Sequence, residues 1–500
     1  MPRTLTGSDP ARLISGRPWP ALRCLGLASL ALWSCVLTAQ TTGVLVGPAR
    51  DLAGDAQTAY LDKRVREFDR PERGLPIDLF AQRVSRAVLN NPSTLAARST
   101  IGAASEAVRE AQAAALPFIT GQVDATARNY DPNSILNTPR QRYETGGAGL
   151  TLRQLIYDFG ATQAGIGAAR EREDATTARV QNRDGDLALR SIEAWYDLVR
   201  ARSQRELARL NLEAMQSMQA FLEQRMQLGG GPVSDVLRAQ TRVTAAFAAW
   251  TTAQSREQVS AAAFRELYRE EPGDIDMPVS VALNARQVAA DSGNLVRDFP
   301  AVRSADAARR AAEQERDQSA ARALPQVNVE LSAQRRDLVG AGEPGTDLGA
   351  FVVMRYNFFT GGADTARTAQ AGYRVSEATE QLRSISLQVE RALAQALAEQ
   401  HSAETVLRAR ADGVTQSIVA LGAVRELFVN RRGSLLDLLN AQETVNLSGQ
   451  AFIDAEIDAA LARWRVLYFT SSFWTLLRLP QTPTAYGAPG SGAPGTEVTR

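Results

Sequence analysis

Two stretches without proline, residues 161–228 and 363–430, constrain the fold of this 500-residue chain more than any other feature. Both are rich in Ala, Arg, Glu, Gln and Leu, which favour helix, whereas proline would interrupt one. Each stretch has about 68 residues, so a helix with a rise of 1.5 Å per residue would be about 100 Å long. Helices of ordinary globular domains have about 8 to 20 residues. The sequence therefore predicts two unusually long helices.

The chain is internally duplicated. A proline-bounded segment at 92–117 has a counterpart of the same length at 300–325. Three pairs of matching positions follow the same order in both halves: Pro92 with Pro300, Gly160 with Gly362, and Asp235 with Asp437. One match could arise by chance, but ordered matches at a nearly constant separation indicate a repeat of about 200 residues.

Each copy of the repeat has the same predicted elements: a helix, two strands, a long helix and a return helix. Polar and apolar residues alternate between 118 and 130 and again between 143 and 157. In the second copy, residues 327–334 alternate in the same way, and the following strand is expected to end at Phe359. Alternation with period two is typical of a strand with one apolar and one polar face.

Short turns connect the long helices to the return helices, which we expect at 233–268 and 434–477. The first turn consists of Gly229, Gly230, Gly231 and Pro232, and the second of Arg431, Arg432 and Gly433. The expected organisation of the whole chain is a signal peptide at 1–39, a flexible N-terminal segment at 40–75, the first repeat at 76–271, a linker at 272–299, the second repeat at 300–479 and a disordered tail at 480–500.

The N-terminus has the pattern of a secretory signal peptide. A basic region precedes an apolar run at 24–37, and the small residue Ala39 follows. The run has about 14 residues, fewer than the roughly 20 that span a bilayer as a helix. Two alternatives stay open, an uncleaved N-terminal anchor and lipidation at Cys35. Cleavage after Ala39 would remove Cys35 and Cys24, the two cysteines of the chain.

The composition argues against most kinds of enzyme. The chain has one histidine, His401, so a Ser–His or Cys–His pair has one candidate base and a zinc site has at most one imidazole. There are 56 Lys and Arg residues against 55 Asp and Glu residues, a net charge of +1 without the basic excess of a nucleic-acid-binding protein. We therefore expect no enzymatic activity, no cofactor, no metal and no nucleic-acid partner.

The strands suggest an assembly of several chains. Four amphipathic strands cannot close a barrel, and open strand edges are not tolerated in lipid. Three chains would supply twelve strands, an even number within the range of outer-membrane barrels, with apolar faces toward lipid and polar faces lining a pore. The long helical hairpins could pack side by side as a cylinder. A soluble sheet with coiled-coil arms is the alternative.

Three segments resemble the TolC family of outer-membrane factors. They are the strand-to-helix junctions 155–160 (LIYDFG) and 356–362 (YNFFTGG) and the turn segment 433–441 (GSLLDLLNA). With the duplication, the resemblance covers about residues 76–478. It implies an α+β membrane protein with four β-strands and long α-helices per chain. It further implies a homotrimer that forms a twelve-stranded β-barrel in outer-membrane lipid, continued by a periplasmic α-helical barrel.

The same resemblance implies a gate at the periplasmic tip. Asp437 matches an aspartate that forms a ring of three at the constriction, and Asn440 stands where the family prototype has a second aspartate. The ring would then carry about three negative charges instead of six and bind cations less strongly. Asp235 and Arg432 match residues that tie the closed state, although Arg432 is displaced by one residue. An alternative role for Asp235 is to stabilise the N-terminus of its helix.

We interpret the chain as the outer-membrane export duct of a type I protein secretion system. The resemblance implies a periplasmic adaptor (membrane fusion) protein and an inner-membrane ABC transporter as partners. Residues 435–468 look more like family members that serve ABC-driven secretion than like drug-efflux members. The alternatives are the channel of a multidrug or metal efflux system with a proton-driven pump and a periplasmic coiled-coil scaffold. The sequence specifies neither the cargo nor the adaptor.

Overall fold

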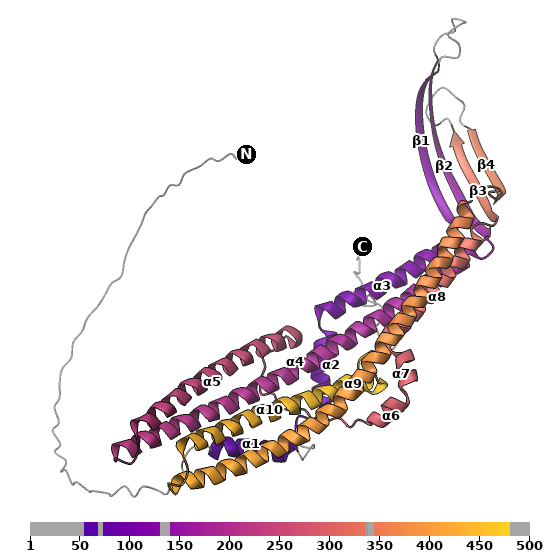
Figure 1. The fold of residues 1–500 in the computed structure, drawn as a ribbon. Coiled ribbons are helices and arrows are strands. Elements are labelled where there is room, and N and C mark those ends of the chain that lie inside the picture. The colour runs from indigo at the N-terminus through magenta and orange to yellow at the C-terminus, as the bar shows by residue number, and fades with distance from the viewer. Residues whose placement is uncertain (1–54, 69–73, 131–140, 337, 339–344, 481–500) are drawn as a thin grey trace, which may run out of the picture. The chain divides into compact units, whose positions relative to one another are not determined.

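The computed structural model describes residues 55–68, 74–130, 141–336, 338 and 345–480 (Figure 1). These residues fall within one compact unit, Asp51–Arg500. The predicted signal peptide at 1–39 and residues 481–500 of the predicted tail lie outside the described residues.

Both halves of the chain contain the same elements in the same order. In the first half these are α3 (Pro92–Ala113), β1 (Phe118–Tyr130), β2 (Gln141–Tyr157), α4 (Ala161–Gln227) and α5 (Val233–Tyr268). In the second half they are α8 (Pro300–Ala321), β3 (Gln326–Arg336), β4 (Gly345–Arg355), α9 (Ala363–Val429) and α10 (Leu435–Tyr468). The shorter helices are α1 (Asp55–Phe68), α2 (Ile77–Leu89), α6 (Ala285–Ala290), α7 (Ser292–Asp298) and α11 (Ser471–Leu476). The predicted duplicated order is confirmed, and α4 and α9 have 67 residues each.

The four strands form one antiparallel sheet in the order β1-β2-β3-β4. Residues opposite one another in register share a face of the sheet. One such row consists of Ile119, Leu152, Leu331 and Ala350. The apolar faces predicted for the separate strands therefore lie on the same side. Within the described residues, β1 and β4 each have one edge without a partner strand.

The long helices and their return helices pack as one layer in the order α5–α4–α10–α9 (Figure 1). Helix α5 buries Ala239, Ala246 and Ala253, which are seven residues apart. This spacing keeps one narrow stripe of a helix against its neighbour, as in coiled coils. In the described part of the chain, α5 and α9 occupy the two edges of the layer. No helix in the ranges given above is both long enough and apolar enough to cross a lipid bilayer.

An aromatic core ties the helices of the two repeats together. Trp195 of α4 is fully buried, and Phe80 of α2 packs against its ring at 5.3 Å between centroids. Trp464 of α10 donates a hydrogen bond of 3.1 Å to the Tyr196 hydroxyl of α4. Burial raises the pKa of Tyr196 from 10.0 to about 12, because the site disfavours the charged phenolate. The linker between the repeats joins this core, because the Trp195 indole donates to the Asp276 carbonyl at 3.1 Å.

The prediction that residues 40–75 are flexible is wrong for residues 55–68, which form helix α1. Leu61 and Gln57 of this helix are fully buried. The buried Arg64 guanidinium lies 2.8 Å from the Glu456 carboxylate of α10 and donates to the Ser203 hydroxyl of α4 at 2.7 Å. The segment looks unstructured in sequence because its buried face is largely polar and its polar groups find partners on distant helices.

Two predicted element ends also differ from the structure. Strand β4 ends at Arg355, and the residues that follow, including Phe358 and Phe359, lie outside the ladder. The last predicted helix is broken at Thr470, whose extended backbone (φ −106°, ψ 154°) separates α10 from α11. The Thr470 hydroxyl donates to the Leu467 carbonyl at 2.7 Å, so it satisfies one of the acceptors that the helix end leaves open.

Candidate functional site

The sheet and the two hairpin turns lie at opposite ends of the long helices. Strands β2 and β4 lead into α4 and α9 through Gly160 (φ +89°) and Gly362 (φ +85°), a backbone conformation that favours glycine. Helices of 67 residues separate these junctions from the turns by about 100 Å. The two turns and the first two turns of α5 and α10, which together we call the tip, contain all of the gate residues that the sequence suggested.

Glycine shapes the first turn, between α4 and α5. Gly229 has φ +73° and donates from its backbone N–H to the Met226 carbonyl at 2.9 Å. The Gly230 N–H donates to the Arg225 carbonyl at 2.9 Å, and the Arg225 guanidinium donates back to the Gly230 carbonyl, also at 2.9 Å. Gly231 lies beside the Arg225 side chain. The side chain of Arg225 thus holds the turn that the glycines allow.

The second turn, between α9 and α10, has an arginine at the position that corresponds to Gly229 in the first turn. Arg431 takes the left-handed conformation (φ +56°) that Gly229 takes in the first turn, and its N–H donates to the Phe428 carbonyl at 3.1 Å. Left-handed backbone is strained for a residue with a Cβ. Gly433 has no such φ, but a Cβ there would lie 3.1 Å from the Phe428 nitrogen. Close backbone approach is therefore what requires glycine at 433.

The tip ends of α4 and α9 contact each other in a way that the sequence did not reveal. The rings of Phe221 and Phe428 lie 6.4 Å apart, and the Arg225 guanidinium lies 5.6 Å from the Phe428 ring centroid. Cation–π contacts of this kind add about 0.5 to 1 kcal/mol at exposed sites. Arg225 thereby holds the first turn through Gly230 and contacts the end of α9 through Phe428. The sequence feature that could have indicated this contact is the pairing of a cation, Arg225, near the end of α4 with an aromatic residue, Phe428, near the end of α9.

Asp437 combines an exposed carboxylate with a capping role. It is the third residue of α10, and its N–H donates to the Ser434 hydroxyl at 3.2 Å while that hydroxyl donates to the Asp437 carboxylate at 2.7 Å. The Ser434 hydroxyl thus caps the helix by accepting from the Asp437 N–H, and the helix N-terminus favours a negative charge there. Asn440 is exposed one turn further along α10. The two residues lie three positions apart and so on one face of the helix.

The structure does not bring Asp235 and Arg432 together within one chain. Asp235 is half-buried in the first turn of α5, and its N–H donates to the Pro232 carbonyl at 3.1 Å. Arg432 is exposed. Among the tip residues that the structure describes, no ion pair joins the two. The tie between these residues stays a prediction that a neighbouring chain would have to satisfy.

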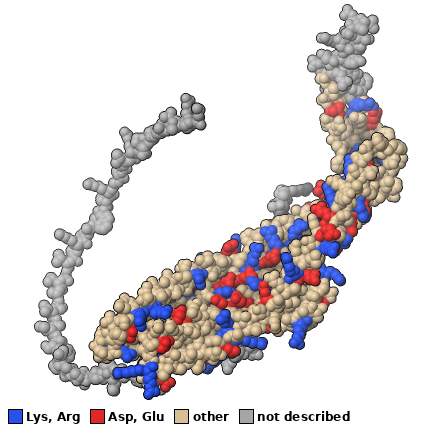
Figure 2. Space-filling view, viewed as in Figure 1, with Lys and Arg blue, Asp and Glu red and all other residues tan. Residues whose placement is uncertain are grey.

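Apolar side chains surround the turns. They are Leu228, Val233, Leu237 and Leu436, which we call the tip surface. Leu228 is 75% exposed and Val233 is 60% exposed. Figure 2 shows the hairpin end of α4 and α5, at the left of the view, as mostly uncharged. Groups of exposed apolar residues are typical of a docking site for another protein.

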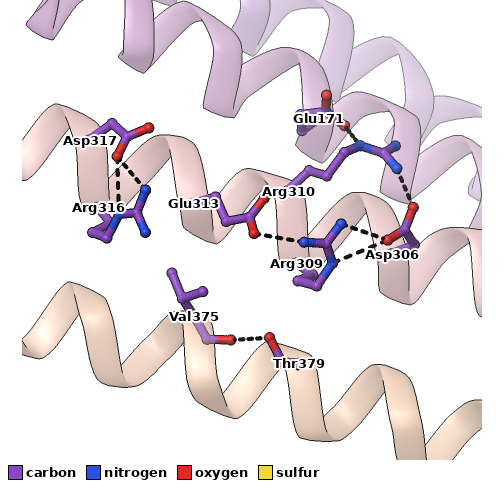
Figure 3. Close-up of polar contacts among 9 residues, drawn as sticks. All are labelled: Glu171, Asp306, Arg309, Arg310, Glu313, Arg316, Asp317, Val375 and Thr379. Atoms are coloured by element: carbon purple, nitrogen blue, oxygen red, sulfur yellow. Dashed lines mark hydrogen bonds and ion pairs between the residues drawn. The ribbon is translucent and has the colours of Figure 1, made fainter.

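The sheet end of the helices carries a dense ionic network instead. Arg310 of α8 binds Glu171 of α4 at 2.8 Å and also pairs with Asp306, while Arg309 binds Glu313 at 2.6 Å (Figure 3). Burial, with the neighbouring Glu171 carboxylate as the next cause, raises the pKa of Asp174. The network fastens α8 to α4. In the described ranges, no group of three or more His, Cys, Asp or Glu residues could hold a metal ion.

Comparison with known proteins places these features in one family. A family model described as outer membrane efflux protein matches residues 84–268 and 295–467, which lie in the two repeats. The chain is 24% identical over 390 residues to the outer membrane efflux protein BepC of Brucella suis biovar 1 (strain 1330), covering 77% of this chain and 83% of that protein.

Solved structures show the same fold. The outer membrane protein VceC from Vibrio cholerae is 19% identical with a TM-score of 0.68, over 77% of this chain and 94% of that one. The outer membrane channel CmeC of Campylobacter jejuni is 14% identical with a TM-score of 0.69, over 77% of this chain and 84% of that one. At this level of identity the likeness concerns the fold alone.

Proposed function

Because the chain belongs to the outer membrane efflux protein family, we propose that three copies of it assemble into a single duct across the outer membrane and the periplasm. Members of this family are outer-membrane channel proteins of tripartite export systems and are not enzymes. The chain is accordingly an outer-membrane protein with a periplasmic tunnel of helices.

The main support for the trimer is that the sheet has one apolar and one polar face and that, in the described part of the chain, its two edge strands each lack a partner on one side. One face is mostly apolar and exposed in the single chain, as Val123 (83%), Leu348 (80%) and Val352 (74%) show, and it also carries Arg335. Pairing β4 of one copy with β1 of the next would satisfy both edges and close twelve strands with this face toward lipid. A head-to-tail contact of this kind forms a ring when its rotation closes.

The helical layer supports the same assembly. Its edge helices expose apolar side chains, among them Phe247 and Val259 on α5 and Val406 and Val419 on the tip half of α9. Packing α5 of one copy against α9 of the next would bury these residues and continue the layer into a cylinder. In both the sheet and the helical layer, each chain would therefore pair with the same neighbouring chain.

The tip of the cylinder is the gate of the duct. Three copies would bring three Asp437 carboxylates around the axis, with Asn440 on the same helix face. Such a ring attracts cations and resists anions. The tip surface receives the periplasmic adaptor protein, whose recognition of this end would pull the turns apart.

The cargo of the duct is a polypeptide delivered by an inner-membrane ABC transporter in type I secretion. The support is the resemblance of residues 435–468 to secretion members of the family. The alternative is a multidrug or metal efflux channel fed by a proton-driven pump, and the descriptions of the matching family and relative, both efflux proteins, favour it. A periplasmic scaffold is excluded by membership in a family of outer-membrane channels.

Deletion of the gene separates secretion from efflux. Secretion predicts that a large polypeptide disappears from the culture medium while susceptibility to drugs and metals is unchanged. Restoration by the wild-type chain, but not by a chain with Leu228→Asp and Val233→Asp at the tip surface, would tie the effect to adaptor docking. Increased susceptibility with an unchanged set of secreted proteins would refute secretion and establish efflux.

A further inference from the structure

The polar face of the sheet carries a group of charged and aromatic residues at the end nearest the helices. The strand register places Phe118, Arg153, Glu330 and Phe351 in one row across β1, β2, β3 and β4. Arg355 of β4 lies on the same face, because it is four residues further along the strand from Phe351. We call these five residues the belt. They face away from the apolar row that contains Ile119.

The belt holds one carboxylate between two guanidinium groups. The Glu330 Oε1 atom accepts from Arg153 Nε at 3.0 Å and from Arg355 at 3.1 Å. The Glu330 side chain is 19% exposed, whereas those of Arg153 and Arg355 are 49% and 55% exposed. Two arginines and one glutamate leave one positive charge per chain that is not neutralised. The shared carboxylate fixes both guanidinium groups on the polar face.

The excess charge is confined to this level of the sheet. Further from the helices, Arg336 pairs with Asp347, and Asp124 lies on the same face. The register also places Arg128 on this face, so the charges there sum to zero. Phe118 and Phe351 flank the arginines at the belt and are 67% and 56% exposed. Large aromatic side chains that are exposed to water on a polar face do not contribute to packing within the single chain, so their role lies in a contact with another molecule.

We propose that the belt forms a fixed ring in the assembled duct that binds the anionic groups of passing cargo, such as carboxylates or phosphates. The inference rests on the proposed trimer, which turns the polar face toward the pore. Three copies would carry six arginines and three glutamates, a net charge of about +3. Arginine suits this role because its planar donors match the oxygens of carboxylate and phosphate.

The dimensions of the pore make the ring effective at moderate salt. Twelve strands about 4.8 Å apart and tilted by about 40° give a barrel radius of roughly 12 Å. Side chains that extend inward shorten the distance from the charges to the axis. The Debye length is about 10 Å at 0.1 M salt and about 3 Å at 1 M. The belt therefore acts across the whole pore at 0.1 M and is screened at 1 M.

Block of single channels by inorganic tripolyphosphate tests the belt. The trimer is inserted into planar bilayers in 0.1 M KCl, and the polyanion is added on the barrel side, so it reaches the belt without passing the tip. We expect block of the wild-type channel. In the double variant Arg153→Gln, Arg355→Gln, the half-blocking concentration should rise about tenfold or more, because two of three charges per chain are removed. Glu330→Gln should lower it.

Arg335→Gln is the matched control. Arg335 lies on the same strand as Glu330, but its register partner is Ala148, which places it on the opposite face. Its removal should leave block unchanged, and 1 M KCl should abolish the difference between wild type and double variant. Equal block of the double variant, or no block of a conducting wild-type channel, would overturn the belt while leaving the duct in place. Failure of the chain to form any channel would overturn the proposed duct and the belt with it.

Discussion

Helix α1 is held against the long helices by a contact that leaves no room for a methyl group. Leu61 of α1 is fully buried, and it packs against Gly449 of α10 and Leu207 of α4. A Cβ at position 449 would lie 2.8 Å from both terminal methyl carbons of Leu61 and 3.1 Å from a methyl carbon of Leu207. Rotation about the Cβ–Cγ bond of Leu61 cannot relieve the overlap, because both methyl groups lie equally close, so the fully buried side chain has to shift as a whole. Gly449→Ala should therefore push α1 away from α10.

The magnitude follows from the cost of overpacking. An extra methyl group in a packed core costs about 1 to 3 kcal/mol. Alanine also favours helix over glycine by about 1 kcal/mol, but this gain stabilises α10 whether α1 is bound or not. The full cost of the overlap thus falls on the docking of α1. It corresponds to a population of detached α1 that is about 5 to 150 times larger than in the wild-type chain.

Tryptic cleavage in α1 measures this population. Lys63 and Arg64 lie in the helix, and cleavage requires local unfolding when reclosing is fast. We expect the cleavage rate at these residues to increase about 5- to 150-fold in Gly449→Ala. Gly413→Ala in α9 is the control, because a Cβ at 413 meets nothing within 4 Å. Equal cleavage rates in Gly449→Ala and wild type would refute the docking of Leu61 on Gly449.

Three further predictions concern the tip and the core. Asp437→Ala should raise conductance in planar bilayers and weaken block by multivalent cations. The control is Ser434→Ala, which removes the helix cap but keeps the charge, and which should cost about 1 kcal/mol of stability without that change in block. Unchanged conductance and block in Asp437→Ala would remove Asp437 from the gate. Arg431→Gly should stabilise the chain to thermal unfolding by about 1 kcal/mol, because glycine takes φ +56° without strain, and a lower melting temperature would contradict this reading of the turn. Burial raises the pKa of Asp186, although the hydrogen bond from Tyr468 lowers it in part. The folded chain therefore holds this proton more tightly than the unfolded chain and loses stability as pH rises above the ordinary carboxyl pKa near 3.8. Asp186→Asn should flatten the dependence of the unfolding free energy on pH in that range, and a pH profile identical to that of the wild type would contradict this.

Local patterns were enough to predict the strands and long helices. The alternation at 118–130 coincides with β1, and proline-free runs give α4 and α9 to within about a residue of their ends. Such predictions succeed because periodicity and proline act on neighbouring residues. They also fix which strand faces are apolar, and the register shows those faces on one side.

Contacts between distant segments could not be predicted. Helix α1 depends on Glu456, which is 392 residues from its partner Arg64. The tip contact between Arg225 and Phe428 likewise joins the two repeats. The belt also required the sheet register, since Arg153 and Glu330 belong to different copies of the repeat. In each case the stabilising partner lies on another helix or strand, so no local pattern contains the information.

The mass and image of the detergent-extracted mature protein test the central claim most directly. Light scattering combined with electron microscopy should give a particle of three chains with a helical section about 100 Å long and a closed cylinder in end view. A monomer or dimer, or a three-chain particle whose α5 and α9 edges remain apart, would contradict the assembly of three copies into one duct.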